Sequence, residues 1–187
     1  EVKQFVDTIN TNCTLLLALI NDILDLSRIE SGSMDFRFAG YNLTFVMQQI
    51  YDSQRLSMPC GVDLVMKLPE GESKSIVTDS VRLKQVINNF INNAKKFTTQ
   101  GAITFGYETE DPGYTVFFVE DTGSGISEEN QRRIFERFYK VDSFTQGAGL
   151  GLSICQTIVE RFRGEINVSS ELGKGTRFTV RVPDFNE

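Results

Sequence analysis

Apolar residues recur at alternating steps of three and four through the first 31 residues of the chain, with Asn12 as the one polar interruption. Such steps place side chains on one face of a helix, and neighbouring apolar positions widen the face. A face this wide is typical of a helical bundle, although a helix packed on its own domain is the alternative. We expect a helix over residues 1–31, ended by the Ser-Gly-Ser of residues 31–33. The series comprises Val2, Phe5, Ile9, Leu16, Leu19, Ile23 and Leu26.

Further along the chain the pattern switches between strand and helix periods. Alternating apolar and polar residues predict strands over 35–38, 62–68 and 75–78, and two hairpins, 102–108 with 114–120 and 165–170 with 176–182. Helical spacing predicts helices over 42–57, 79–97 and 149–162, and a short helix after Ser127. Asn42 and Asp79 are candidate N-caps. Strands grouped beside several helices, without strict alternation, predict an α+β domain of two layers.

Composition narrows the classes of function. A chain of 187 residues suits one domain, with or without an appendage. The net charge of -6 and the lack of a basic stripe argue against nucleic-acid binding. No apolar run is long enough to span a bilayer, so we expect no direct membrane contact. Three scattered cysteines (Cys13, Cys60 and Cys155) and no histidine argue against a zinc site and predict buried free thiols in a reducing cytosol.

Four asparagines occupy positions 88, 89, 92 and 93, in the middle of the predicted helix 79–97. Asparagine is unfavourable in a helix interior, which suggests a use beyond solvation. Asn89 and Asn93 lie one turn apart on the same face, and Lys96 shares the face of Asn93. An amide oxygen is a good neutral ligand for Mg²⁺, and a lysine can reach a phosphate as a point charge. Exposed, simply solvated asparagines are the alternative.

Asp121 directly follows the predicted strand 114–120, whose residues 116–119 are strongly apolar, and begins the segment DTGSGI. A carboxylate there can accept a hydrogen bond from an exocyclic amine, which distinguishes adenine from guanine. Gly123 and Gly125 allow a tight turn and a close approach of the backbone to a flat ring. A turn without a ligand is the alternative, and the neighbouring segments favour the site.

A third segment, GAGLGLS over residues 147–153, precedes an apolar helix. Backbone amides of Gly147, Gly149 and Gly151 at such a helix start can bind an anion, although the segment is not a Walker loop. The polar stretch between residues 126 and 147 could close over phosphates as a mobile lid. Its aromatic residues Phe135 and Phe138 could equally be core contacts, and the two roles are compatible.

These segments together resemble the ATP-binding catalytic domain of sensor histidine kinases, in the superfamily shared with gyrase, the Hsp90 chaperones and MutL. Residues 89–98 resemble the N box, 121–126 the first glycine box, 135–139 the F box and 147–153 the second glycine box; 173–176 resembles a further glycine motif. Residues 1–32 resemble the second helix of the dimerisation and phosphotransfer hairpin. The resemblance divides the chain into that helix and an ATP-binding domain over 33–187.

The resemblance implies a fold and a set of roles. The fold is an α/β sandwich with a mixed, largely antiparallel sheet covered by helices on one face and preceded by one long bundle helix. Asn93 takes the position of the magnesium ligand, and Asn89 and Lys96 are the implied catalytic residues at the phosphates. The implied contacts to the adenine side are Phe97, Asp121, Gly123 and Gly125, and those to the phosphates are Gly147, Gly149, Gly151 and, on lid closure, Arg137. Ile126 and Leu150, inside the glycine boxes, are further implied nucleotide contacts.

Two departures from the family pattern refine the implied activity. The phosphoacceptor histidine and its acidic neighbour belong to the first hairpin helix, which we expect to lie outside this chain. ATP-hydrolysing relatives place a glutamate base one turn before the magnesium asparagine, and here that position holds Asn89, which cannot take a proton from water. The pattern therefore favours a kinase over an ATPase of the gyrase and Hsp90 type, with a nucleotide-gated binding module as the other alternative.

The resemblance also implies the surroundings of the full-length protein. Its partners would be ATP with Mg²⁺, its own phosphoacceptor hairpin in a homodimer, and the receiver domain of a response regulator. The catalytic part would lie on the cytoplasmic side, and the full-length protein would sit in the inner membrane of a bacterium.

Overall fold

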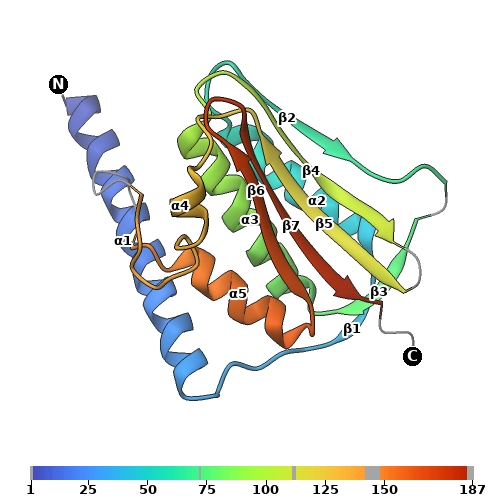
Figure 1. The fold of residues 1–187 in the computed structure, drawn as a ribbon. Helices are drawn as coiled ribbons and strands as arrows, with labels where there is room; N and C mark the ends of the chain where they lie inside the picture. The colour runs from blue at the N-terminus through green and yellow to red at the C-terminus, as the bar shows by residue number, and fades with distance from the viewer. Residues whose placement is uncertain (1, 72, 111–112, 142–147, 185–187) are drawn as a thin grey trace.

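A long helix stands beside a two-layer sandwich in the computed structural model, which describes residues 2–71, 73–110, 113–141 and 148–184 (Figure 1). The described strands of the sandwich form one sheet in the order β2 (Val62–Lys67), β4 (Gly101–Glu110), β5 (Tyr114–Asp121), β7 (Gly175–Pro183) and β6 (Glu165–Glu171). β2 and β4 are parallel, and the other neighbours are antiparallel. The predicted mixed, largely antiparallel sheet is confirmed.

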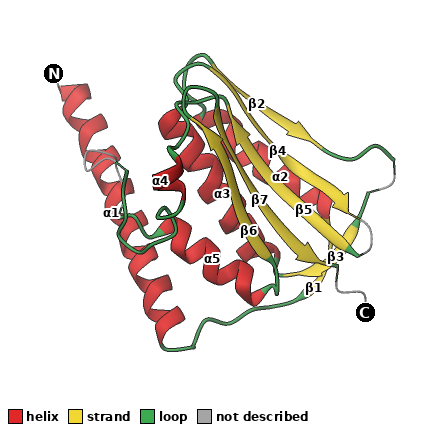
Figure 2. Cartoon of the chain, viewed as in Figure 1, coloured by secondary structure: helices red, strands yellow, loops and turns green. Residues whose placement is uncertain are grey.

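One face of this sheet carries the helix layer, formed by α2 (Leu43–Gln54), α3 (Ser80–Phe97) and α5 (Gly151–Arg161) (Figure 2). Alternate strand residues point into the layer, and Phe90 of α3 stacks on Phe178 of β7 with ring centroids 4.9 Å apart. The other face is charged: Arg177 donates hydrogen bonds to Glu108 and Glu120. Because one face is apolar and the other is charged, the helices cover a single side.

The predicted helix starts of α2 and α3 are both confirmed by side-chain caps. The side chain of Asn42 accepts a hydrogen bond from the amide of Phe45 at 3.0 Å. The side chain of Asp79 accepts from the amides of Val81 and Arg82, at 3.0 and 3.1 Å. Each cap satisfies amides that the first helical turn leaves without partners. α2 ends earlier than predicted and continues as the 3₁₀ turn η1 (Arg55–Ser57).

The predicted strand over 35–38 is wrong, because those residues have no regular secondary structure. The strand β1 (Ala39–Asn42) begins just after them and pairs antiparallel with β3 (Ser75–Thr78) in a separate two-stranded sheet. The alternation that suggested a strand comes from Phe36 and Phe38, whose rings both meet Phe162 edge-on at 6.0 Å. Their periodicity reflects packing on the end of α5 rather than pairing with another strand.

α1 (Val2–Glu30) runs along the left side of Figure 1, and its C-terminal half lies against the sandwich. Leu26 and Ile29 are partly buried and pack on the hydrophobic core. Farther out the stripe is open to solvent, with Phe5 70% and Ile9 59% exposed. The described part of the stripe therefore favours the bundle prediction over packing on its own domain. Within the described residues, no helix has the length and hydropathy needed to cross a bilayer.

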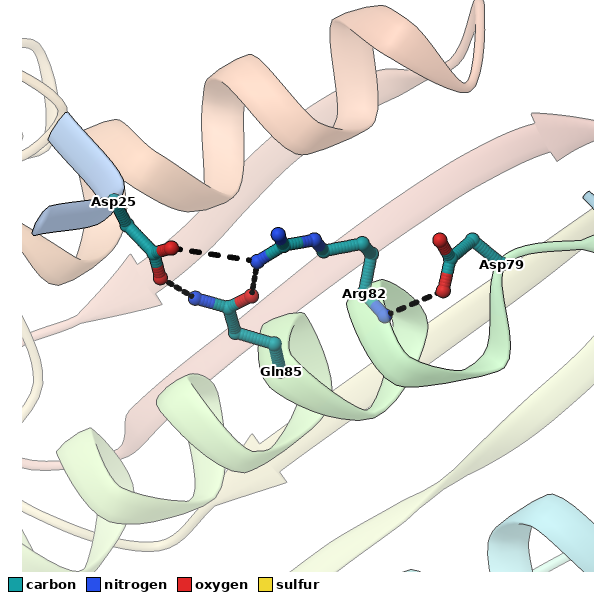
Figure 3. Close-up of polar contacts among 4 residues, drawn as sticks. All are labelled: Asp25, Asp79, Arg82 and Gln85. Carbon is teal, nitrogen blue, oxygen red and sulfur yellow. Dashed lines mark hydrogen bonds and ion pairs between the residues drawn. The ribbon is translucent and has the colours of Figure 1, made fainter. Parts of the chain in front are cut away.

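A polar cluster joins α1 to α3 (Figure 3). The carboxylate of Asp25 accepts a hydrogen bond from Nε2 of Gln85 at 2.7 Å and lies 3.5 Å from Nη1 of Arg82. Arg82 also donates to Oε1 of Gln85 at 2.8 Å. Both charged side chains are 15% exposed, so the pair is largely shielded from water. We call these three side chains the α1–α3 latch.

The three thiols do not share one environment. Cys155 is buried in α5, whereas Cys13 and Cys60 are exposed. The prediction of buried thiols is therefore wrong for two of them. Cys13 belongs to the solvent-facing stripe of α1, and Cys60 lies in the loop after η1.

Candidate functional site

A cleft of about 950 Å³ opens between α3, the end of β5, the start of α5 and the C-terminal half of α1. It gathers predicted residues from all three chemistry-bearing segments of the sequence. The predicted residues that line it are Asn89, Asn93, Lys96, Phe97, Asp121, Gly125, Ile126, Gly149 and Gly151. The fold thus brings together side chains that are far apart in the sequence.

Three of the predicted site residues are described but do not line this cleft, and a fourth lies outside the described residues. Leu150 is fully buried beneath the start of α5. Gly123 lies behind the wall, where its amide donates to Asp121 Oδ1 at 2.8 Å. Arg137 points to α1 and pairs with Glu30 at 2.6 Å. Gly147 falls outside the described residues, as do residues 142–146 of the predicted lid.

The asparagines of α3 have two different roles: Asn88 bonds to a neighbouring helix, whereas Asn89 and Asn93 line the cleft. Asn88 accepts a hydrogen bond from Gln54 of α2 at 2.8 Å and so joins two helices. Asn93 Nδ2 donates to Asn89 Oδ1 at 3.2 Å. That bond leaves the amide oxygen of Asn93 available as a ligand. Among the described residues no group of three or more His, Cys, Asp and Glu side chains could hold a metal. The single amide oxygen of Asn93 fits an ion such as Mg²⁺, which keeps most of its waters and shares phosphate oxygens with the protein ligand.

Lys96 and Asp22 carry opposite charges at the α1 side of the cleft. Loss of water around its ammonium lowers the pKa of Lys96, an effect that Asp22 opposes and Lys140 adds to. Burial raises the pKa of Asp22, and the nearby Asp25 raises it further, while Lys96 lowers it. Sequence reasoning missed Asp22 as a site residue. Its one signal was that Asn21 and Asp22 interrupt the densest apolar run of α1.

Asp121, the last residue of β5, is 7% exposed and lies on the cleft wall. Burial raises the pKa of its carboxyl, and hydrogen bonds from the amides of Gly123 and Thr176 oppose that rise. A buried carboxylate in a wall is well placed to accept a hydrogen bond from a planar amine. Thr176 and Phe178 of β7 line the wall as well and were not among the predicted site residues, although Thr176 lies in the glycine motif 173–176.

Close backbone approaches explain the glycines of the site. Gly125 has φ +71°, and a Cβ there would lie 2.1 Å from the carbonyl oxygen of Glu171. Gly149 has φ +73°, and a Cβ there would meet the carbonyl oxygen of Tyr139 at 2.8 Å. A side chain at either position would be strained and would clash with backbone. These glycines therefore bring the walls of the cleft together.

The described part of the predicted lid is fastened at two points. The ring of Phe135 meets Phe178 edge-on at 6.5 Å and packs on the core. Phe138 is exposed, has φ 62° and donates its amide to the carbonyl of Gly149 at 2.9 Å. One aromatic side chain is thus a core contact and the other is not.

The family described as histidine kinase-, DNA gyrase B- and HSP90-like ATPase matches residues 78–186, a span that holds every predicted site residue. The chain belongs to this family. The match covers α3, the sheet from β4 onward and α5, which are the elements that form the cleft apart from α1.

Curated relatives of the chain are sensor kinases. The autoinducer 2 sensor kinase/phosphatase LuxQ of Vibrio cholerae is 36% identical over 193 residues, which cover 98% of this chain and 22% of that protein. The sensor histidine kinase RcsC of Escherichia coli K12 is 34% identical over 193 residues, which cover 97% of this chain and 20% of that protein. The chain therefore spans about a fifth of the length of these relatives.

Solved structures of histidine kinases share the fold. Full-length ShkA in complex with AMPPNP superposes with a TM-score of 0.87 at 28% identity, covering 99% of this chain and 39% of that one. The catalytic domain of the histidine kinase ThkA superposes with a TM-score of 0.68 at 28% identity, covering 79% of this chain and 96% of that one. The match to ShkA extends over α1 as well as the sandwich.

Proposed function

We propose that this chain is the ATP-binding catalytic part of a two-component sensor histidine kinase. It transfers the γ-phosphoryl group of ATP to a histidine outside the chain, for relay to an aspartate of a response-regulator receiver domain. The observation that carries the proposal is the cleft that gathers Asn89, Asn93, Lys96 and Asp121 with the two glycine segments. Membership of the family and the sensor-kinase relatives support it.

Adenine binds at the β5 side of the cleft. The carboxylate of Asp121 accepts a hydrogen bond from the exocyclic amine, which selects adenine over guanine. Phe97 supplies an apolar surface from the end of α3, and Ile126 and Gly125 complete the wall. Gly123 contributes indirectly, because its amide holds the carboxylate of Asp121.

The phosphates bind between α3 and the start of α5. Lys96 offsets their charge and Asn89 orients them, while Gly149 and Gly151 let the backbone approach. Asn93 would hold Mg²⁺, which supplies further charge neutralisation when bound. Leu150 contributes by packing beneath this backbone rather than by contact.

Two further residues, Gly147 and Arg137, belong to the proposed phosphate end of the cleft. Gly147 would complete the phosphate loop. Arg137 would reach the phosphates only after leaving Glu30, with which it pairs in this structure.

The transfer of the γ-phosphoryl group requires no covalent bond between the nucleotide and this chain. An imidazole from another segment attacks the γ-phosphorus in line, and the chain positions the nucleotide and stabilises the spreading charge. Asn89 stands where a water-activating base would be needed for hydrolysis, and an amide cannot accept that proton at neutral pH. This favours transfer to histidine over ATP hydrolysis.

Residues 1–32 are the second helix of the dimerisation and phosphotransfer hairpin, and 33–187 form the catalytic domain. The exposed apolar stripe of α1 supports this division, because Phe5, Ile9 and Leu16 of this stripe are exposed here. Their partners are the first hairpin helix and a second copy in a homodimer. The full-length protein spans the inner membrane of a bacterium, with this part on the cytoplasmic side.

Phosphotransfer in trans tests the proposal. The chain is mixed with γ-labelled Mg-ATP and a separately made bundle that carries the first hairpin helix and its histidine. We expect acid-labile label on the added helix, and no label with Asn93→Ala or Asp121→Ala. Because the chain has no histidine, it should acquire no acid-labile label alone.

Two other outcomes would overturn the proposal. Nucleotide binding without label, using a bundle covalently continuous with the chain, would indicate a nucleotide-gated module. Steady release of phosphate without any acceptor would indicate an ATPase.

A further inference from the structure

Asp22 brings a negative charge into a cleft whose proposed ligand is itself negative. It lines the cleft from α1, whereas Asn89, Asn93 and Lys96 line it from α3, and its charge acts on Lys96. Those residues form the proposed phosphate end. Asp22 lies outside residues 78–186, so the family match does not extend to it.

The position of Asp22 is enforced by its neighbours on α1. Asp25, one turn farther along, is bound by Arg82 and Gln85 in the α1–α3 latch (Figure 3). Leu26 packs on the core one turn after Asp22. Because α1 is held by both polar and apolar contacts, the part of the helix that carries Asp22 is held against the cleft.

Asp22 and Lys96 stabilise each other's charge in this partly dry space. Loss of water disfavours both charged forms, and each group offsets part of that cost for the other. Asp25 and Lys140 are the other charged groups that act on the pair. When phosphates bind at Lys96, they replace Asp22 as the main anionic partner of its ammonium group. The carboxylate of Asp22 then lies near groups of the same charge and is repelled by them.

We propose that Asp22 is a nucleotide-site residue supplied by α1: it holds Lys96 before ATP binds and opposes the phosphates afterwards, so that it sets nucleotide affinity according to phosphate number. The proposal rests on the proposed function, because it takes the cleft to be an ATP site. Asp22 is a positioning residue for Lys96 and a determinant of specificity among adenine nucleotides, and it takes no part in bond making.

Calorimetric titration of the whole chain with adenosine, AMP, ADP and ATP tests the proposal. Asp22→Asn keeps the shape of the side chain and removes its charge. We expect the variant to bind ATP about tenfold more tightly than the parent, with a smaller gain for ADP, a smaller one still for AMP, and none for adenosine. The gain for ATP should grow when Mg²⁺ is withheld, because the free triphosphate carries more charge.

Asp63→Asn is the matched control, because it removes one carboxylate by the same substitution. Asp63 is exposed on β2 and does not line the cleft. The control variant should change no affinity. Weaker ATP binding by Asp22→Asn in the presence of Mg²⁺ would overturn the proposal and indicate that the carboxylate helps to hold the metal. Equal changes for adenosine and ATP would overturn it as a merely structural effect. If the parent chain binds no nucleotide, the proposed function itself is wrong and this inference is wrong with it.

Discussion

A Cβ atom on Gly151 would lie 2.2 Å from Nδ2 of Asn89. The first residue of α5 is therefore closed against the middle of α3, with no room for a side chain between them. This contact places the amide of Asn89 against the backbone of Gly151 where the proposed phosphates bind. It also explains why a glycine stands at the helix start, apart from any direct contact with a ligand.

Gly151→Ala should disturb both stability and binding. The added methyl group must displace Asn89 or separate the helices, which we expect to lower the free energy of unfolding by about 1–3 kcal/mol and to weaken ATP binding. Urea unfolding followed by far-UV circular dichroism measures the first effect, which suits a chain without tryptophan. Gly40→Ala is the control, because a Cβ there meets nothing within 4 Å. An unchanged unfolding midpoint for Gly151→Ala would contradict the geometric argument.

The α1–α3 latch should contribute measurably to stability. Asp25→Ala leaves Arg82 and Gln85 without their shared acceptor in a shielded site, so we expect a loss of about 1–3 kcal/mol. A double-mutant cycle with Arg82→Ala should return a coupling of about 1 kcal/mol between the two side chains.

The comparison pair for this cycle is Glu128 and Arg132, an exposed pair one helical turn apart. Its coupling should stay below about 0.5 kcal/mol because water screens it. Similar couplings for the two pairs would mean that burial does not strengthen the latch.

Asp121→Asn should separate stability from binding. Folding raises the pKa of the Asp121 carboxyl group, so the protonated group favours the folded state. This stabilisation is complete at pH values below the ordinary aspartate pKa, and it is lost as the pH rises through the raised pKa. Removing the charge should therefore stabilise the fold near about pH 7, and the gain should vanish towards about pH 4.

The same variant should bind ATP at least about tenfold more weakly, because a neutral amide is a poorer acceptor than a carboxylate. Asp63→Asn, at an exposed position, should alter neither property. A stabilisation that persists unchanged in acid would rule out ionisation of Asp121 as its cause.

The thiols offer an independent test of the fold. Cys13 and Cys60 are exposed, whereas burial raises the pKa of Cys155 and keeps its reactive thiolate scarce. A thiol reagent should modify two cysteines of the native chain quickly and the third only on unfolding. Fast labelling of all three without denaturant would contradict the burial of Cys155 in α5.

Local signals were sufficient for most elements and singled out many of the residues that line the cleft. Asn42 and Asp79 marked two helix starts because a cap is a short-range interaction between a side chain and the next turn. The site residues on α3 and at the end of β5 could be predicted because each carries its chemistry within one segment. Their convergence in one cleft could not be derived from spacing alone, and it entered through the resemblance of the segments to a family.

Errors arose where a distant partner determines the role of a residue. Phe36 and Phe38 alternate like a strand because both meet Phe162. Asn88 resembles its neighbours in sequence, but its amide oxygen binds Gln54 of α2. Asp22 appeared in the sequence only as one of two polar residues that interrupt the densest apolar run of α1, because its position in the cleft depends on how α1 lies against the sandwich.

The one-sided attachment of α1 makes the helix a lever. Asp25, Leu26 and Ile29 hold it near its C-terminal end, while Phe5 and Ile9 face solvent. At the helical rise, Phe5 lies roughly 30 Å from Asp25, so a rotation of about 10° at the latch displaces it by about 5 Å. The displacement falls in proportion to the distance from the latch at Asp25, and Asp22 lies only about one helical turn from it. A large movement among the exposed residues therefore reaches the cleft as a shift of about one ångström or less.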